Sequence, residues 1–106
     1  MYSQKEIHQV MVDQGFWEDK KPNIAEKLCL IHSEVSEALE VLRDNYFGTD
    51  EESADLIRKT DISEELADIV IRVLDLAEYL DIDINEAIDY KMDYNKRREY
   101  KHGKRF

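Results

Sequence analysis

Apolar residues recur at helical spacing in four stretches of the chain and predict four helices. The predicted helices run from about 4 to 14, from Asn23 to about Arg43, from Asp61 to about Leu80, and from Asp83 to about Arg98. Each follows a side chain that can accept a free backbone N–H and that stands three residues before a glutamate, the positions being Ser3, Asn23, Asp61 and Asp83. Between 44 and 60 the pattern lapses, and we interpret this connection as a lid or part of a subunit contact.

The apolar stripes of these helices indicate how the helices pack. The second helix carries its stripe at Ile24, Leu28, Ile31, Val35, Leu39 and Leu42, and the third at Leu66, Ile69, Val70, Val73, Ala77 and Leu80. In the fourth helix Ala87, Ile88 and Met92 are expected to face the core. We therefore predict an all-α protein, an antiparallel four-helix bundle that forms one domain over 1–106 and is completed by dimerisation.

Composition supports this architecture and bounds the setting. The chain is 42% hydrophobic and 38% charged with only 3 Gly and 1 Pro, which favours long helices joined by short loops. Cys29 is the single cysteine, so an intrachain disulfide is excluded and a cytoplasmic location is expected. We find neither an apolar run long enough to cross a bilayer nor a signal peptide, and we expect no membrane partner.

Two pairs of acidic residues stand on the second and third predicted helices. Glu34 and Glu37 are three residues apart, as are Glu65 and Asp68, so each pair shares one helix face. Crowded, partly buried carboxylates repel one another, and a hard cation offsets that cost. Mg²⁺ is expected because this ion prefers oxygen ligands, and Mn²⁺ is a possible substitute. The alternative is a solvated acidic face, which is common for one such pair alone.

A basic row lies on the fourth predicted helix. Lys91, Asn95 and Arg98 fall on one stripe and offer a point charge, a neutral donor and a planar fork, which suit phosphate. An ordinary exposed face is the alternative. The net charge of −10 argues against a nucleic-acid polymer as partner, although residues 96–106 form a basic tail that could close over a metal-bound triphosphate or only solubilise the chain end.

These blocks together resemble the MazG-like all-α nucleotide pyrophosphohydrolases. The resemblance rests on Glu34-x-x-Glu37, on the segment from Glu64 to Arg72, and on a third block from Lys91 to Arg98 that is close to the dCTPase-like branch. It covers residues 24 to about 104. Ser33 stands where many bacterial members carry another glutamate, which leaves the number of metal ions and the choice of general base open.

The resemblance implies an activity and a set of roles. The reaction would be Mg²⁺-dependent hydrolysis of a nucleoside or deoxynucleoside triphosphate to the monophosphate and pyrophosphate. The metal ligands would be Glu34, Glu37, Glu65 and Asp68, with Glu34 or Glu37 as catalytic base. Phosphate binding would fall to Lys91, Asn95 and Arg98. The expected assembly is a homodimer or a dimer of dimers.

Aromatic and histidine side chains carry weaker signals. Trp17, which follows Phe16 in the first connection, is a candidate to stack on a base, but it could equally plug the end of the helical core. His8 is expected to be a surface or hydrogen-bonded histidine, and His32 and His102 are not assigned to the site. Neither acidic pair has a histidine partner at Glu-x-x-His spacing, which disfavours a di-iron centre.

A second function stays open beside hydrolysis. The chain could be a non-enzymatic helical dimerisation module whose acids form a solvated face, with Arg72 paired to Glu65 or Asp68.

Overall fold

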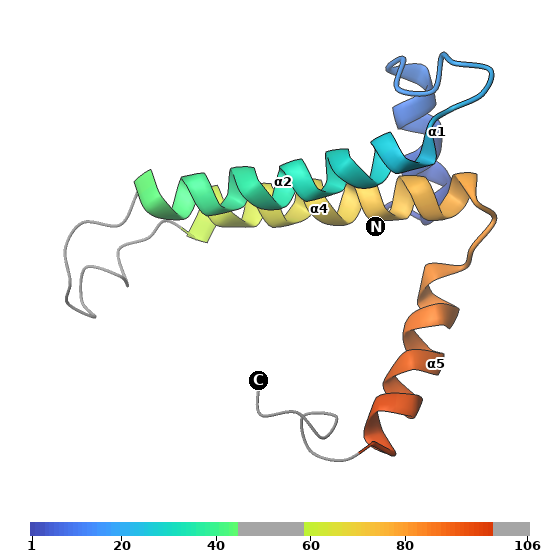
Figure 1. Ribbon diagram of the computed structural model, residues 1–106, viewed down its shortest axis with the longest axis vertical. Coiled ribbons are helices and arrows are strands. Elements are labelled where there is room, and N and C mark those ends of the chain that lie inside the picture. Colours follow the sequence, from blue (N-terminus) through green and yellow to red (C-terminus); the bar gives the residue numbers. More distant parts are fainter. Residues whose placement is uncertain (45–58, 99–106) are drawn as a thin grey trace.

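The structure is a computed structural model that describes residues 1–44 and 59–98. Over these ranges the chain is all-α, without strands (Figure 1). Its four helices are α1 (Gln4–Asp13), α2 (Ile24–Asp44), α4 (Lys59–Tyr79) and α5 (Ile84–Lys96). The all-α class and the approximate bounds predicted from periodicity are confirmed. The predicted lid or subunit contact at 44–60 and the last part of the basic tail fall almost entirely outside the described residues.

Local side-chain bonds explain most helix starts. Ser3 accepts from the backbone N–H of Glu6, and Glu6 accepts from that of Ser3, so the predicted capping box forms. Asp83 caps α5 in the same position through the backbone N–H of Glu86. Asp61 is different. Because α4 begins at Lys59, Asp61 lies within the first turn, where a negative charge favours the helix dipole, and it is not the cap that the sequence suggested.

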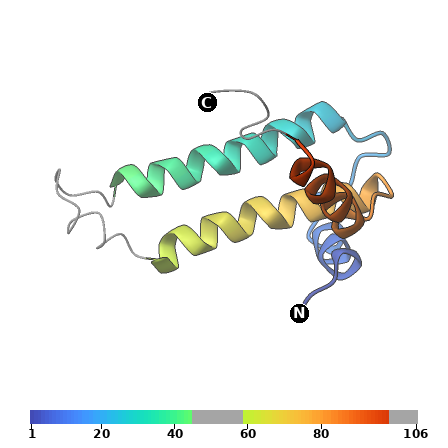
Figure 2. The same cartoon turned by 90° about the horizontal axis from the view of Figure 1, so that it is seen from below.

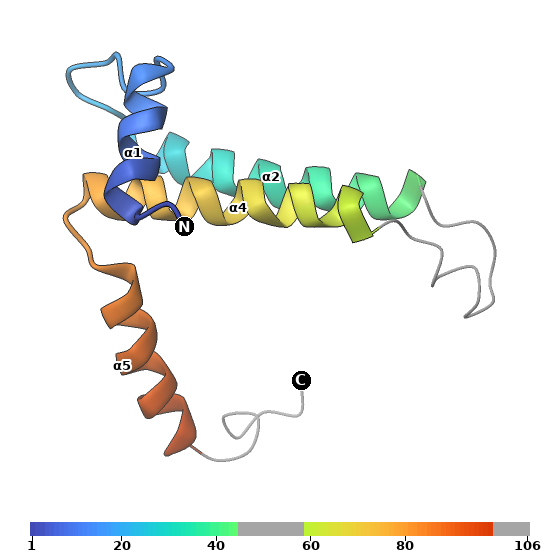
Figure 3. The same cartoon turned by 180° about the vertical axis from the view of Figure 1, so that it is seen from behind.

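The long helices α2 and α4 run antiparallel, side by side, and define the body of the molecule (Figures 1 and 2). Helix α1 crosses α4 near one end of this pair, and α5 leaves the end of α4 on the opposite side (Figures 1 and 3). Among the described residues, the buried apolar side chains are Met11 on α1, Ala38 on α2, and Leu76 and Ala77 on α4. The core is therefore small, as a chain of this length allows.

Asp75 locks α1 and the first connection onto α4. Its carboxylate is 5% exposed, and its Oδ1 lies 2.6 Å from Nδ1 of His8 on α1. Trp17 donates from Nε1 to both carboxylate oxygens, at 2.9 and 3.0 Å, and its ring stacks on Tyr79 with centroids 4.4 Å apart. Lys27 completes the cluster from α2, with Nζ 4.3 Å from the Trp17 ring. A buried carboxylate with several donors is thus the polar anchor of this end.

Helix α5 is joined to the body at its start and is largely exposed beyond it. Gln4 donates from Nε2 to the carbonyl of Ile82 at 2.7 Å and accepts from the backbone N–H of Ile84, which fixes the turn before α5. Ile88 and Met92, which were expected in the core, are 50% and 51% exposed. That expectation is wrong within one chain, because α5 points away from α2 and α4 (Figure 1).

The same correction applies to parts of the stripes on α2 and α4. Several side chains predicted for the core are exposed, namely Leu28, Val35, Leu39, Leu42, Leu66, Val70 and Leu80. They recur at helical spacing, so each helix presents an apolar row that the single chain leaves uncovered. Within the described residues, none of the helices is long and apolar enough to span a membrane.

Replacing Asp75 with Ala is expected to lower the free energy of unfolding by about 2 to 3 kcal/mol, because the buried donors of His8 and Trp17 lose their acceptor. Urea denaturation followed by circular dichroism measures this loss. Asp89→Ala on the exposed part of α5 is the matched control and should change stability by less than about 0.5 kcal/mol. Equal effects of both substitutions would contradict the anchor role of Asp75.

Candidate metal centre

Three carboxylates from the two long helices converge midway along the pair. Glu34 and Glu37 of α2 and Glu65 of α4 each place an oxygen within 4.8 Å of the others. The convergence follows from local geometry: the i, i+3 spacing puts Glu34 and Glu37 on one face of α2, and the antiparallel pairing brings Glu65 opposite them. We call these three residues the acidic cluster. The sequence prediction that the acidic pairs meet is thus confirmed for three of its four members.

The fourth predicted acid lies beside the acidic cluster. Asp68 and Arg72, one and two turns after Glu65 on α4, line the same cavity as Glu34 and Glu37. Asp68 is therefore near the acids, but it does not belong to the group whose oxygens lie within 4.8 Å of one another.

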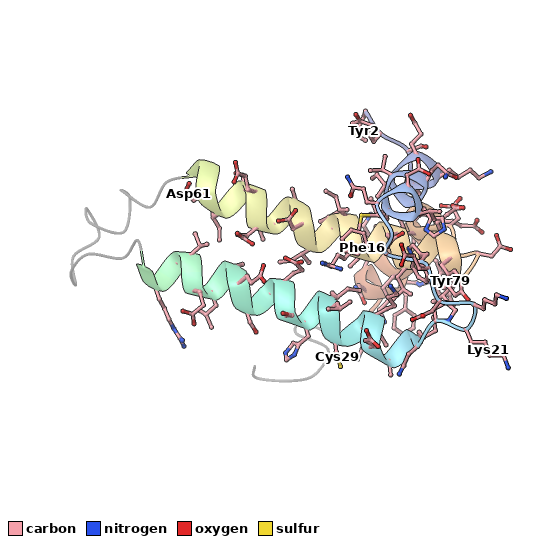
Figure 4. All side chains as sticks on the ribbon, turned by 90° about the horizontal axis from the view of Figure 1, so that it is seen from above. Tyr2, Phe16, Lys21, Cys29, Asp61 and Tyr79 are labelled. Atoms are coloured by element: carbon pink, nitrogen blue, oxygen red, sulfur yellow. The ribbon has the colours of Figure 1, made fainter. Side chains whose placement is uncertain are left out.

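The cavity has a volume of about 520 Å³, within the usual range for small-molecule sites. One wall is acidic and comes from α2 and α4. The other is mainly apolar and comes from α1 and the residues that flank it, with Tyr2, Ile7, Val10, Met11, Gln14 and Phe16. Figure 4 shows Phe16 and Tyr79 at the end of the helix pair that α1 crosses, with Asp61 at the far end. The α1 crossing thus gives the acidic cluster an apolar neighbour.

Glu34 is the buried member of the acidic cluster and forms an ion pair with a cationic side chain. It is 9% exposed, and its Oε1 accepts from Nε of Arg72 at 2.6 Å. The Arg72 guanidinium lies 5.4 Å from the centroid of the Phe16 ring, a cation–π contact that holds it beside the cavity. The suggestion that Arg72 pairs with Glu65 or Asp68 of its own helix is wrong, because the ion pair crosses between helices to Glu34.

Glu37 is exposed, yet its pKa is raised above the ordinary value of 4.5. The hydrogen bond with Glu34 is the largest cause, followed by the negative charge of Glu34, by desolvation and by the charge of Glu65. The positive charge of Arg72 acts in the opposite direction and lowers the pKa. The neighbours of Glu37 together therefore favour its protonated form.

The residues of the acidic cluster fit a hard divalent cation. All the candidate ligand atoms are carboxylate oxygens, the donor type that Mg²⁺ and Mn²⁺ accept. Oε2 of Glu65 is shielded from solvent and has no hydrogen-bond partner among the described residues. A shielded carboxylate oxygen without a donor is costly, and a cation would satisfy it. The donor set is thus compatible with the metal expected from the sequence.

The predicted phosphate-binding row stands apart from the cavity. Lys91, Asn95 and Arg98 belong to α5 and the residues just after it, which project away from the α2–α4 pair (Figures 1 and 3). Lys91 and Arg98 contact the ring of Tyr94, at 4.9 and 5.4 Å from its centroid. Oδ1 of Asn95 is shielded and has no partner among the described residues. Within one chain these three residues do not join the acids.

Trp17, the predicted base-stacking residue, does not line the cavity. Its ring is enclosed by Tyr79, His8 and Lys27, so in this chain it serves as the core plug that was the alternative interpretation. Phe16 beside it reaches the cavity. Whether Phe16 or Trp17 faces the cavity depends on the turn at Gly15, whose φ of +89° sets the direction of the chain after α1. Helical periodicity does not predict the direction of this turn.

Sequence reasoning also missed the roles of Arg72 and Asp75. Both stand in the polar row of α4 with Glu65 and Asp68, so the signal was present as a shared helix face. Their partners are on other helices, Glu34 for Arg72 and His8 for Asp75, and only the packing of the helices selects them.

Replacing Glu37 with Gln should stabilise the protein in EDTA above about pH 5, because the substitution mimics the protonated carboxyl without its charge. A carboxyl whose folded-state pKa is raised contributes stability below its unfolded value of 4.5, and this contribution is lost as the pH rises through the folded-state pKa. The melting temperature of the variant minus that of the wild type should therefore be near zero at pH 4 and become positive as the pH rises.

Thermal unfolding between pH 4 and 8 measures this difference. Glu40→Gln, one turn away on α2, is the control, because Glu40 pairs with Arg43 at the surface and stands outside the acidic cluster. Its melting temperature should stay level with or slightly below that of the wild type. A Glu37→Gln variant that is less stable than the wild type at neutral pH would show that the cluster carries no repulsion.

Comparison with known proteins adds no family assignment. The chain matches no family model, no characterised protein and no solved structure. The interpretation of the acidic cluster therefore rests on its own geometry and on the sequence motifs.

Proposed function

We propose that the protein hydrolyses nucleoside or deoxynucleoside triphosphates to the monophosphate and pyrophosphate with Mg²⁺, for which Mn²⁺ can substitute. The observation that carries the proposal is the convergence of Glu34, Glu37 and Glu65 beside a half-apolar cavity of about 520 Å³. An acidic wall suits a cation that binds phosphates, and an apolar wall suits a base. The α–β bond as the site of cleavage comes from the MazG-like resemblance of the motifs.

The metal ligands in this proposal are the acidic cluster and Asp68. Glu34 and Glu65 hold the shielded side of the site, and Glu37 and Asp68 its more exposed side. Bound Mg²⁺ would neutralise charge on the phosphate chain and make a coordinated water more acidic.

Glu37 is the better candidate for the general base. Glu34 already accepts from Arg72, whereas Glu37 is exposed to the solvent from which a water must come. We therefore propose Glu37 rather than Glu34 as the general base, a choice that the motifs left open.

The apolar wall provides the position for the base of the nucleotide. Phe16 offers an aromatic face, and Ile7, Val10 and Met11 of α1 offer aliphatic contact. Trp17 donates to Asp75 and does not line this cavity, so in this proposal it does not contact the base. Aromatic and aliphatic contacts of this kind bind any base. Gln14 is a neutral polar side chain of this wall that could form hydrogen bonds with the edge of the base.

A homodimer, alone or as half of a dimer of dimers, completes the proposal. The apolar rows of α2 and α4 include Leu39 and Val70, exposed by 46% and 54%, and α5 adds Ile88 and Met92. A second copy offers the same rows and can cover them symmetrically. Phosphate binding by Lys91, Asn95 and Arg98 also requires a second copy, because α5 projects away from the cavity of its own chain.

One observation favours the alternative, a non-enzymatic dimerisation module. The Arg72–Glu34 pair neutralises one acid without any metal, and exposed apolar rows suit a partner helix. In that case the acids would only be a polar face, and the cavity would have no ligand. Catalytic turnover distinguishes the two functions.

Val70→Glu should convert the dimer into a monomer, because a charge at the centre of the α4 row cannot be buried against a second copy. Light scattering after size exclusion should give twice 12.6 kDa, or a multiple of that pair, for the wild type and 12.6 kDa for the variant. Val12→Glu, at an apolar position on α1 that is 39% exposed, should leave the mass unchanged. A wild type that is monomeric at micromolar concentration contradicts the dimer.

Incubation with Mg²⁺ and a panel of triphosphates should release pyrophosphate and no orthophosphate. Glu37→Gln and Asp68→Asn should each lower turnover by about 100-fold or more while helicity is kept, because each removes a ligand or base from the site. The Glu40→Gln control should retain wild-type turnover. Full activity in both site variants would place the chemistry elsewhere, and absence of turnover with every triphosphate would favour the dimerisation module.

A further inference from the structure

Arg72 is the only cationic side chain among the described residues that line the 520 Å³ cavity. It makes its ion pair through Nε, and its two terminal nitrogens have no hydrogen-bond partner among the described residues. The guanidinium rests beside Phe16, and the side chain is 22% exposed. The pair with Glu34 therefore holds Arg72 at the cavity wall while most of its donors are unused.

This ion pair competes directly with a cation. Oε1 of Glu34 is 2.6 Å from Nε of Arg72, and the same carboxylate belongs to the acidic cluster. A guanidinium keeps its charge at any pH at which the protein is folded, so it cannot relieve the conflict by deprotonation. A divalent cation bound by Glu34 would repel Arg72 at short range. The Arg72 guanidinium and a divalent cation therefore compete for the carboxylate of Glu34.

A displaced guanidinium at a partly buried position needs another anion. Leaving such a charge without a counter-ion is costly, and a bidentate acceptor such as a phosphate group satisfies the planar fork better than a single carboxylate oxygen. A phosphate chain on the cation would lie in the cavity that Arg72 already lines. The geometry therefore links the cation and the anion through one side chain.

We propose that Arg72 exchanges partners: a divalent cation entering the acidic cluster displaces it from Glu34, and the freed guanidinium then binds the phosphate group of the ligand. The inference rests on the proposed function, since it needs a cation in the acidic cluster. It adds that the metal-free protein carries its own counter-ion and that Arg72 is a phosphate-binding residue. Cation and phosphate then bind with positive coupling, which is reciprocal.

Isothermal titration of Mg²⁺ and of inorganic pyrophosphate tests the exchange. In Arg72→Gln, Mg²⁺ alone should bind about fivefold to tenfold more tightly than in the wild type, because its competitor is gone. The affinity of the variant for pyrophosphate in saturating Mg²⁺ should fall by about tenfold or more, because the guanidinium that binds the phosphate group is gone. Arg43→Gln, which removes a surface guanidinium of α2 paired with Glu40, should change neither constant.

A nuclear magnetic resonance measurement separates partner exchange from a fixed electrostatic effect. The Nε–Hε signal of Arg72 should shift when Mg²⁺ is added, as the bond to Glu34 breaks, and shift again with pyrophosphate. The signal of Arg43 should stay in place. Arg72→Lys, which keeps the charge, identifies the signal and provides a second variant for titration if Arg72→Gln does not fold; it should bind pyrophosphate more weakly than the wild type.

The outcomes separate this inference from the proposed function. If Mg²⁺ binds and its binding requires Glu37, but the Arg72 signal does not shift, the partner exchange is wrong and the metal site is still supported. Equal or weaker Mg²⁺ binding in a folded Arg72→Gln variant leads to the same conclusion. Absence of Mg²⁺ binding in the wild type overturns both the exchange and the metal site.

Discussion

Repulsion among carboxylates held between two helices is the constraint on which the site depends. The positions of Glu34, Glu37 and Glu65 are set by α2 itself and by the packing of α2 against α4. Arg72 offsets one negative charge, and the pKa of Glu37 is raised by its hydrogen bond with Glu34 and by the negative charges of Glu34 and Glu65. A helical protein that needed only stability would place apolar side chains there. The retention of acids at this position is what turns a helix pair into a candidate site for a cation.

The helices and the acidic rows were predictable because both depend on spacing along the chain. Helical periodicity and capping side chains gave α1 and α5 within a few residues, and the i, i+3 spacing of Glu34 and Glu37 placed them on one face. Contacts between helices were not predictable in the same way. The ion pair of Arg72 with Glu34 and the hydrogen bond from Trp17 to Asp75 depend on how the helices cross. The spacing of residues along one sequence does not reveal that crossing.

The largest difference from expectation concerns α5 and the apolar rows. Periodicity shows that a face is apolar, but it does not say whether the same chain or a second copy covers that face. Ile88, Met92 and Val70 were assigned to the core and are exposed in one chain. The expected bundle of four packed helices is therefore incomplete in the single chain. The predicted phosphate-binding row lies on or just after α5 and is likewise away from the α2–α4 pair. The second copy that we propose would account for both features.

Anomalous scattering from crystals grown with Mn²⁺ tests the central claim most directly, because Mn²⁺ takes the same oxygen ligands as Mg²⁺ and is located without reference to activity. The account predicts a peak between α2 and α4, within coordination distance of oxygens from Glu34, Glu37 and Glu65. Crystals in which Mn²⁺ binds only elsewhere, with Arg72 still bonded to Glu34, would contradict it.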